Sequence, residues 1–255
     1  MLLALDVGNT TVTIGVFEGE DLRATWRLAT DVGRYADEYG LMMTSLLQHD
    51  GLAVADINEA VIACVVPDLE PRFQTICKRY FNVKPLLVGL GIKTGLRILY
   101  DTPRDVGADR VCDAVAASQL YGPPLIVVDL GTGTVFDAIN QEGDYVGGAI
   151  APGLGIASEA LFSRAAKLYR VELTRPSSPI GRNTINAIQS GIIFGYVGLI
   201  EGIVARMKQE IGEDCKVIGT GGYAEIICPE TKVIDRVNPD LTLQGLRLIF
   251  DLNRS

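Results

Sequence analysis

The chain opens with an alternation of apolar and polar positions that occurs again in its second half. Residues 2–7 form an apolar run that contains one carboxylate, Asp6, and continue through a glycine turn into a second apolar segment. Residues 125–130 repeat this arrangement, with Asp129 in the place of Asp6. Apolar strands joined by a Gly-containing polar turn are typical of a β-hairpin. We therefore expect a hairpin in each half, and two related domains, residues 1–121 and 122–255.

The two copies also agree in register. Asp6, Gly8, Thr11 and Val12 recur with the same spacing as Asp129, Gly131, Thr134 and Val135. Both copies then reach an acidic turn with a glycine, at residues 18–21 and 142–144. This agreement favours a duplicated structural unit over two unrelated hairpins.

The remaining pattern predicts a mixed α/β protein in which hairpins precede helices in each half. In the first half we expect strands at 22–28, 60–66 and 85–88, and helices at 37–48, 69–81 and 108–120. In the second half we expect a glycine-rich crossing at 147–155, helices at 156–166 and 184–211, and a strand from 216 that enters a glycine turn.

Composition narrows the class of protein. Hydrophobic residues make up 48% and charged residues 21% of the 255 residues, as in an ordinary globular protein. The net charge of −8 argues against nucleic acid or an anionic membrane as a partner, because either needs a concentrated basic face. We expect no signal peptide, no segment long enough to span a bilayer, and a cytoplasmic protein.

Two residue types limit the chemistry. The five cysteines form no CxxC pair, which favours free thiols in a reducing compartment. His49 is the one histidine, so histidine metal sites and Ser-His triads are excluded. A catalytic base would then be a carboxylate or a rarer group.

The repeated turns indicate phosphate chemistry. Glycine and hydroxyl residues in a turn present N–H and O–H donors to a phosphate, and a carboxylate at a strand end can hold a cation beside it. Two facing turns of this kind would clamp a nucleotide for phosphoryl transfer. An ordinary hairpin with Gly-Asn turn residues is the alternative for one copy alone.

Several motifs occur in an order that is similar to one known family. They include Asp6–Thr10, Tyr100–Arg104, Gly107–Arg110, Asp129–Thr134, Gly147–Gly153, Asn183-Thr184, Gln189–Gly191 and Thr242–Leu246. Together they resemble the type III pantothenate kinases of the acetate and sugar kinase/Hsp70/actin superfamily. The resemblance implies two ribonuclease-H-like (actin-like ATPase) domains related by internal duplication, with a nucleotide cleft between them. It also implies ATP-dependent phosphorylation of pantothenate, the first step towards coenzyme A.

The resemblance further implies roles for single residues. The ATP phosphates would contact Thr132 and the residues of the first turn, which are Asp6, Val7, Gly8, Asn9, Thr10, Thr11, Val12 and Thr13. Asp6 would lie beside Mg²⁺, and Asp129 would bind K⁺ or ammonium. Pantothenate would contact Tyr100, Gly107, Ala108, Asp109, Arg110 and Thr184.

Asp109 would accept the proton of the pantothenate hydroxyl. Phosphoryl transfer to an alcohol needs such an acceptor. Arg110 would suit the pantothenate carboxylate, because guanidinium and carboxylate groups pair in bidentate fashion. The structural alternatives are a helix-start aspartate for Asp109 and a surface or Asp-paired arginine for Arg110.

Two alternatives concern the second half. Asp129 could instead be a second Mg²⁺ ligand, and Thr184 could simply cap the long helix that follows it. The resemblance implies that Thr184 reaches the substrate of a neighbouring subunit. The small residues Gly191, Gly195 and Gly198 permit close helix packing in a homodimer, and equally in a core.

Two residues depart from the family pattern. Asp113 stands where an amide is expected, and Arg182 stands where a lysine is frequent. Both concern the local charge balance rather than the activity, and they leave the assigned chemical groups in place. Two other functions stay open: another small-molecule kinase or polyphosphate hydrolase of the superfamily, and an inactive nucleotide-binding regulator. The intact Asp6, Asp109 and Asp129 argue against the regulator.

Overall fold

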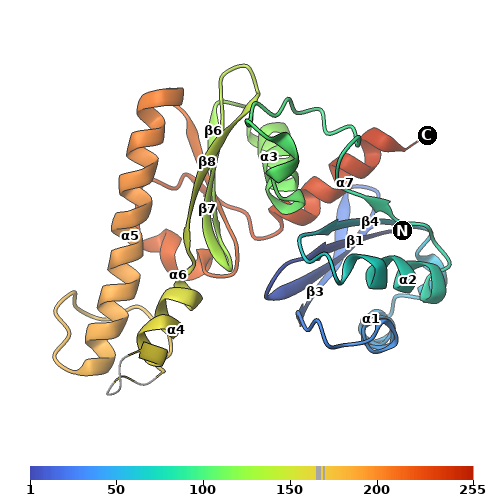
Figure 1. Ribbon diagram of the computed structural model, residues 1–255, viewed down its shortest axis with the longest axis horizontal. Helices are drawn as coiled ribbons and strands as arrows, with labels where there is room; N and C mark the ends of the chain where they lie inside the picture. The colour runs from blue at the N-terminus through green and yellow to red at the C-terminus, as the bar shows by residue number, and fades with distance from the viewer. Residues whose placement is uncertain (165–167, 169, 255) are drawn as a thin grey trace. The chain divides into compact units, whose positions relative to one another are not determined.

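The computed structural model describes residues 1–164, 168 and 170–254, and contains two five-stranded mixed sheets (Figure 1). The first sheet has the order β3-β2-β1-β4-β5, and the second has the order β10-β9-β6-β7-β8. Its strands are β1 (Leu2–Val7), β2 (Thr11–Glu18), β3 (Asp21–Ala29), β4 (Glu59–Cys64) and β5 (Leu86–Leu87). Those of the second are β6 (Leu125–Leu130), β7 (Gly133–Ile139), β8 (Tyr145–Pro152), β9 (Lys216–Thr220) and β10 (Arg236–Val237).

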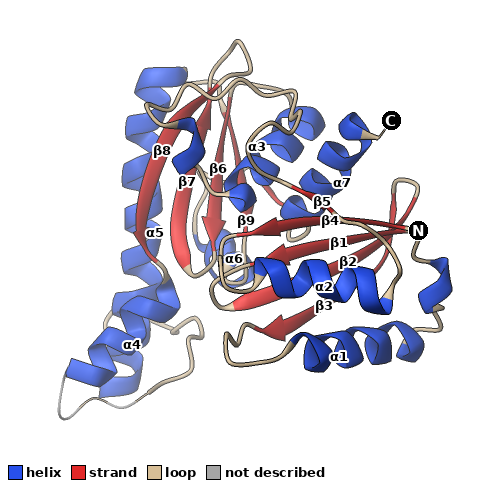
Figure 2. Cartoon of the chain, turned by 45° about the vertical axis from the view of Figure 1, so that its right-hand side comes forward, coloured by secondary structure: helices blue, strands red, loops and turns tan. Residues whose placement is uncertain are grey.

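The two sheets have the same topology. In each, the first strand lies in the centre, antiparallel to the second and parallel to the fourth, and the third lies outside the second. β1 and β6 also share one burial pattern. In each strand the carboxylate residue is partly exposed and the other five residues are buried. The duplication expected from the repeated hairpin is thus present in the strand order (Figure 2).

The helices follow the expected positions closely in the first half. They are α1 (Ala36–His49), α2 (Glu70–Tyr80) and α3 (Ala108–Tyr121). The second half has α4 (Leu154–Arg164), α5 (Thr184–Ile211), the short α6 (Ala224–Ile227) and α7 (Leu241–Asn253). The expected end of the 156–166 helix lies outside the described residues. Three short 3-10 helices lie at Val54–Asp56, Pro103–Asp105 and Cys228–Glu230.

One predicted element is wrong. Residues 147–155, expected as an irregular glycine-rich crossing, contain the strand β8, which pairs antiparallel with β7 from Tyr145 to Pro152. Glycine lowers intrinsic strand propensity, but pairing with an available strand edge overrides that preference. β8 is the counterpart of β3 in the duplicated topology.

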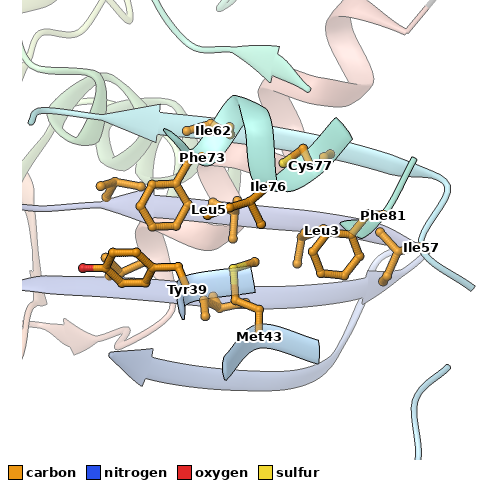
Figure 3. Packing of buried hydrophobic residues seen from close by; sticks show 14 of the residues in the cluster. Leu3, Leu5, Tyr39, Met43, Ile57, Ile62, Phe73, Ile76, Cys77 and Phe81 are labelled. Atoms are coloured by element: carbon orange, nitrogen blue, oxygen red, sulfur yellow. The ribbon is translucent and has the colours of Figure 1, made fainter. Parts of the chain in front are cut away.

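The core of the first sheet lies between its strands and the helices α1 and α2 (Figure 3). Leu3 and Leu5 of β1 point at Phe73 and Ile76 of α2, with Met43 of α1 beside them. Because side chains alternate along a strand, the even-numbered residues of β1, Asp6 among them, lie on the opposite face. On that face Leu243 of α7 packs against Gly15.

The second sheet has its own core, formed with α4, α5 and α6. Ile126, Val128 and Leu130 point into it from β6, so that Asp129 again lies on the other face. Among the described residues, one helix, α5, is long and apolar enough to span a bilayer, with a window of mean hydropathy 1.6. The expectation that no segment reaches that length was therefore wrong. Half of that window is buried inside the protein, as expected of a core helix.

The chain divides into two compact units. The first comprises residues 1–96, 101–116 and 241–255, and the second comprises residues 97–100 and 117–240. The division expected from the sequence, 1–121 and 122–255, differs because α7 packs on β1, β2 and β4 of the first sheet. Residues 97–100 belong to the second unit because this segment pairs with Tyr145, the first residue of β8.

Candidate active site

The first turn is held by its own backbone. The Gly8 N–H donates to the Thr11 carbonyl at 3.0 Å, and the Thr30 hydroxyl donates to the Gly8 carbonyl at 2.7 Å. A Cβ on Gly8 would lie 3.0 Å from the Thr11 carbonyl oxygen, so a side chain there would press on the turn. Asn9 and Thr10 at the tip are exposed. The turn is therefore a fixed loop with exposed polar residues, and Thr30 is a supporting residue that the sequence did not reveal.

Asp6 lies at the carboxyl end of β1, between Thr13 of β2 and Ala63 of β4. Its residue is partly exposed, whereas Leu5 and Val7 beside it are buried. The last residues of the parallel strands β1 and β4 lie at one edge of the sheet, where the Val65 N–H donates to the Val7 carbonyl at 3.1 Å. Asp6 therefore lies at the end of the sheet that holds the first turn.

Asp109 reaches the same edge from the first turn of α3. One of its carboxylate oxygens, Oδ1, accepts the Arg110 backbone N–H at 2.8 Å. A Cβ on Gly107 would overlap this oxygen and lie 3.5 Å from the Val65 side chain, which follows β4. Gly107 is therefore required for the carboxylate to lie against the start of the helix. Arg110 is the next residue on α3 and is half-buried.

The pKa values of two cysteine thiols respond to these carboxylates. Burial raises the pKa of the Cys112 thiol well above its ordinary value, and the nearby charges of Asp113, Asp6 and Asp109 raise it further. Burial also raises the pKa of Cys64, with smaller effects from Glu70 and Asp6. Asp6 and Asp109, 103 positions apart in the printed numbering, thus lie in one negatively charged neighbourhood of the first unit.

The third carboxylate of this neighbourhood, Asp113, is buried with an exposed fraction of 3%. Its Oδ1 accepts the Thr242 hydroxyl of α7 at 2.7 Å. A Cβ on Gly245 would overlap the carbonyl of Cys112, so α7 approaches α3 through a glycine. The sequence singled out the 242–246 motif, but its role in joining α7 to α3 was not recognised.

The second unit contains a corresponding but different cradle. Asp129 lies at the end of β6, next to Thr220 of β9. A Cβ on Gly131 would lie 3.2 Å from its Oδ1, and one on Gly221 would overlap that oxygen as well as the backbone of Leu130. Gly221 also has a φ of +91°, which favours glycine. Glycine backbone therefore lies directly against the carboxylate of Asp129, which is partly exposed.

The loop after β6 is supported from a third segment. The Gly153 N–H donates to the Thr132 carbonyl at 3.2 Å, and a Cβ on Gly153 would overlap that oxygen. The Tyr223 N–H donates to the Leu130 carbonyl at 3.0 Å. Thr132 itself is exposed. Three segments thus meet around Asp129 and Thr132, and they contain Gly131, Gly153 and Gly221. The repeat predicted only the segment with Gly131.

Tyr100 belongs to the second unit and is half-buried. Its ring lies 6.2 Å from that of Tyr145, with an angle of 55° between the two planes. A Cβ on Gly147 would lie 3.7 Å from the Tyr100 ring, an ordinary packing distance. The sequence did not reveal this cluster.

Thr184 is the first residue of α5 and is exposed. The helix cap is Asn183, whose side chain accepts the Asn186 N–H at 2.9 Å. The alternative that Thr184 serves as the cap is therefore wrong. Its side chain instead lines a groove of about 690 Å³, together with Leu161, Leu168, Gly181, Arg182, Asn183, Ala187, Ile188, Gly191 and Ile192.

The predicted site residues thus fall into two groups. The turn at residues 6–13 and the segment at 107–110 are brought together in the first unit. Tyr100, Asp129, Thr132 and Thr184 belong to the second unit. Within the second unit, Asp129 and Thr132 share one cradle.

Comparison with solved structures shows the fold. A conserved protein from Campylobacter jejuni, assigned to the Baf family of transcriptional activators, is similar over 98% of both chains, with 17% identity and a TM-score of 0.62. The activator of 2-hydroxyisocaproyl-CoA dehydratase from Clostridium difficile, with bound ADPNP, has 13% identity and a TM-score of 0.52, over 99% of this chain and 95% of that one. The ethanolamine utilization protein EutJ from Carboxydothermus hydrogenoformans gives the same identity and TM-score, over 97% and 89% of the chains.

These likenesses show the fold and confirm the α/β class with two related five-stranded sheets. The family is established separately, by a family model rather than by the structural neighbours. The model of the type III pantothenate kinases matches residues 2–206, which include both hairpins and the 107–110 motif. The chain belongs to the type III pantothenate kinase family, whose members phosphorylate pantothenate with ATP in coenzyme A biosynthesis.

Proposed function

We propose that this chain phosphorylates pantothenate at its primary hydroxyl through a division of work between its two carboxylate neighbourhoods. The observation that carries the proposal is that Asp6 and Asp109 lie at the same end of the parallel strands β1 and β4, where Val65 bonds to Val7 and lies 3.5 Å from a Cβ on Gly107. Asp6 ends the strand that leads into the phosphate-binding turn, and Asp109 lies in the first turn of a helix. A cation ligand and a proton acceptor are the two roles that phosphoryl transfer to an alcohol requires of such groups.

The turn at residues 6–13 would contact the phosphates of ATP. Its exposed tip offers backbone N–H groups and the Thr10 hydroxyl, and its base is fixed by the hydrogen bond from Thr30. Asp6 offers carboxylate oxygens, which fit Mg²⁺, since this ion prefers a few carboxylates and retains waters. When bound there, Mg²⁺ would offset phosphate charge. Whether Asp6 contacts it directly or through water stays open.

Asp109 would accept the hydroxyl proton. Asp109 lies in the first turn of α3, where its Oδ1 accepts the Arg110 backbone N–H at 2.8 Å, and the N-terminus of a helix favours a negative charge. Gly107, Ala108 and Arg110 would contact pantothenate beside it, with the Arg110 guanidinium directed to the substrate carboxylate. Tyr100 would contact the pantoyl portion. These assignments rest on the family motif together with the contacts described above.

Asp129 would hold K⁺ or ammonium, and Thr132 would contact an ATP phosphate. The backbone cradle formed by Gly131 and Gly221 supports this assignment, because it fixes a carboxylate without side chains to fill the space around it. A monovalent ion suits a site with one carboxylate and several neutral oxygens. The cation would offset the negative charge of the phosphates during positioning and transfer.

The working form would be a homodimer in the cytoplasm. Among the described residues, nothing lies within 4 Å of a Cβ placed on Gly191, Gly195 or Gly198, so this side of α5 is open. Thr184 lines the groove at the start of the same helix. A second copy packed along α5 would bring Thr184 to the substrate of its partner, in a symmetric interface.

An assay of ADP release tests the proposal, run with and without pantothenate. We expect ADP release only when pantothenate is present, together with formation of 4'-phosphopantothenate. Release without any acceptor would indicate a polyphosphate or nucleotide hydrolase. ATP binding without release under any condition would indicate an inactive regulator. Either result would contradict the proposed function.

A further inference from the structure

The carboxylate of β7, Asp137, is buried at a place for which the proposed reaction gives no role. Its exposed fraction is 1%, and its Oδ1 accepts the hydroxyl of Tyr145 at 2.6 Å. Tyr145, the first residue of β8, is also fully buried. A distance of this size is typical of a hydroxyl donating to an ionised carboxylate, which is among the stronger hydrogen bonds in proteins. The bond fixes the direction of the Tyr145 ring.

Tyr145 in turn holds the segment that carries Tyr100. Its backbone N–H donates to the Arg97 carbonyl at 2.9 Å, and its carbonyl accepts the Leu99 N–H at 2.8 Å. Residues 97–99 therefore run alongside Tyr145, as one further short strand would. The Tyr100 and Tyr145 rings then meet at 6.2 Å in a tilted arrangement, a favourable geometry for aromatic pairs.

Two further contacts hold the same segment. Arg97 pairs with Asp144 through two hydrogen bonds, one of them from Nε to Oδ1 at 2.9 Å. The Arg97 guanidinium holds the pKa of the Asp144 carboxyl below its ordinary value. Gly147, with a φ of +135°, lets the Tyr100 ring lie against the backbone of β8. The Tyr100 ring thus lies beside the backbone of Gly147 on one side and beside the Tyr145 ring on another.

We infer that Asp137 and Tyr145 are positioning residues that act through Tyr100 and set the affinity for pantothenate. This inference rests on the proposed contact between Tyr100 and the pantoyl portion of the substrate. Pre-orienting a binding side chain lowers the entropy lost when the substrate binds. The buried carboxyl group of Asp137 fixes one orientation of the Tyr145 ring through this hydrogen bond, which an apolar residue in its place would not do.

The test is a double-mutant cycle on the full-length enzyme. Tyr145→Phe removes the hydroxyl and keeps the ring, Tyr100→Ala removes the contact side chain, and the third variant combines both changes. We expect Tyr145→Phe to raise the KM for pantothenate about tenfold and to leave the KM for ATP unchanged. On the Tyr100→Ala background the same change is expected to have less than about a twofold effect, because residues that act as a unit are not additive.

Two matched variants separate positioning from general loss of stability. Asp137→Asn keeps a carbonyl oxygen that can accept the Tyr145 hydroxyl, and is expected to raise the KM less than Tyr145→Phe does. Tyr121→Phe removes another tyrosine hydroxyl of the same unit, which accepts the Asn238 amide at 3.0 Å, and is expected to leave the KM unchanged. Thermal unfolding of each variant shows that it is folded. If Tyr145→Phe does not fold, Asp137→Asn and Asp137→Leu are compared in its place.

An unchanged KM in Tyr145→Phe would overturn the inference, and so would an equal rise on the Tyr100→Ala background. The failures can be told apart. If the wild-type enzyme does not phosphorylate pantothenate, the proposed function fails. If the wild-type enzyme is active but Tyr100→Ala has a normal KM, the role of Tyr100 fails, and the present inference fails with it. If Tyr100→Ala raises the KM and Tyr145→Phe does not, only the positioning role is wrong.

Discussion

Three carboxylates of the first unit act on one region, where their negative charges repel one another. A bound cation would reduce this repulsion. Asp6, Asp109 and Asp113 all raise the pKa of the buried Cys112 thiol, which shows that their charges act on one small region. Like charges at such a place favour cations, and polar donors such as Thr242 stabilise the buried one.

Replacing the proposed base tests the chemistry at the residue scale. We expect Asp109→Asn to fold normally and to lower kcat about 10²- to 10⁴-fold, since the change keeps the shape and removes the proton acceptor. Steady-state kinetics with pantothenate provide the measurement. Asp105→Asn makes the same change at an exposed position four residues earlier and serves as the control. A wild-type kcat in Asp109→Asn would show that the proton acceptor is another group.

A second residue-scale prediction concerns the cation at Asp129. We expect activity to require K⁺ or ammonium and to be poor in Na⁺, because this carboxylate leaves a charge that an ion of suitable size and hydration offsets. Rates are compared in buffers that contain a single monovalent cation. Asp129→Ala is expected to weaken the dependence of the rate on K⁺ more than its dependence on ATP. Equal rates in Na⁺ and K⁺ buffers would contradict the assignment.

Glycines decide how closely the elements approach one another. α7 packs on the first sheet and against α3, and this contact depends on Gly245, because a Cβ there would overlap the Cys112 carbonyl. Gly221 has the corresponding effect on the cradle around Asp129 in the second unit. A Cβ on Gly245 would meet only backbone, and one on Gly221 would meet the backbone of Leu130 as well as the Asp129 carboxylate, so the backbone atoms cannot easily move away.

The element-scale prediction is that Gly245→Ala destabilises the protein by about 1–3 kcal/mol, the usual range for overpacking in a core. The measurement is the free energy of unfolding in urea. Gly202→Ala is a matched control on α5, where the added Cβ would meet only the end of the Arg206 side chain at 3.3 Å. We expect this control to be neutral or slightly stabilising, because alanine favours helix more than glycine. Equal stabilities of the two variants would show that α7 can shift without loss.

At the scale of the whole molecule, the open side of α5 and the exposed Thr184 support a working dimer. The relevant prediction is complementation between two inactive chains. We expect a mixture of Asp109→Asn and Thr184→Arg chains to recover activity, because a mixed dimer would hold one doubly damaged site and one intact site. Turnover per mixed dimer would reach up to half of the wild-type value.

Mass spectrometry that detects subunit exchange is the control for this experiment, and each variant alone supplies the baseline. Exchange without recovered activity would show that each site is built within one chain. Thr184 would then have no role in the partner's site.

The sequence by itself determined the duplicated architecture and its chemistry-bearing positions. The repeated hairpin located Asp6 and Asp129, because strand alternation and turn residues are local properties that the chain order displays directly. Most first-half elements were predicted within one or two residues for the same reason. The ordered motifs also identified the family, which the match over residues 2–206 confirmed. The roles of individual site residues stay predictions.

Other features were decided only by tertiary structure, since they depend on partners that lie far away in the chain. β8 forms from a glycine-rich segment because β7 offers it an edge, although its own strand propensity is low. α7 joins the first unit because its apolar face and Gly245 fit the surface that β1, β2 and α3 present. The bond between Asp137 and Tyr145 is likewise invisible in the sequence, because pairing across two strands brings these buried groups together.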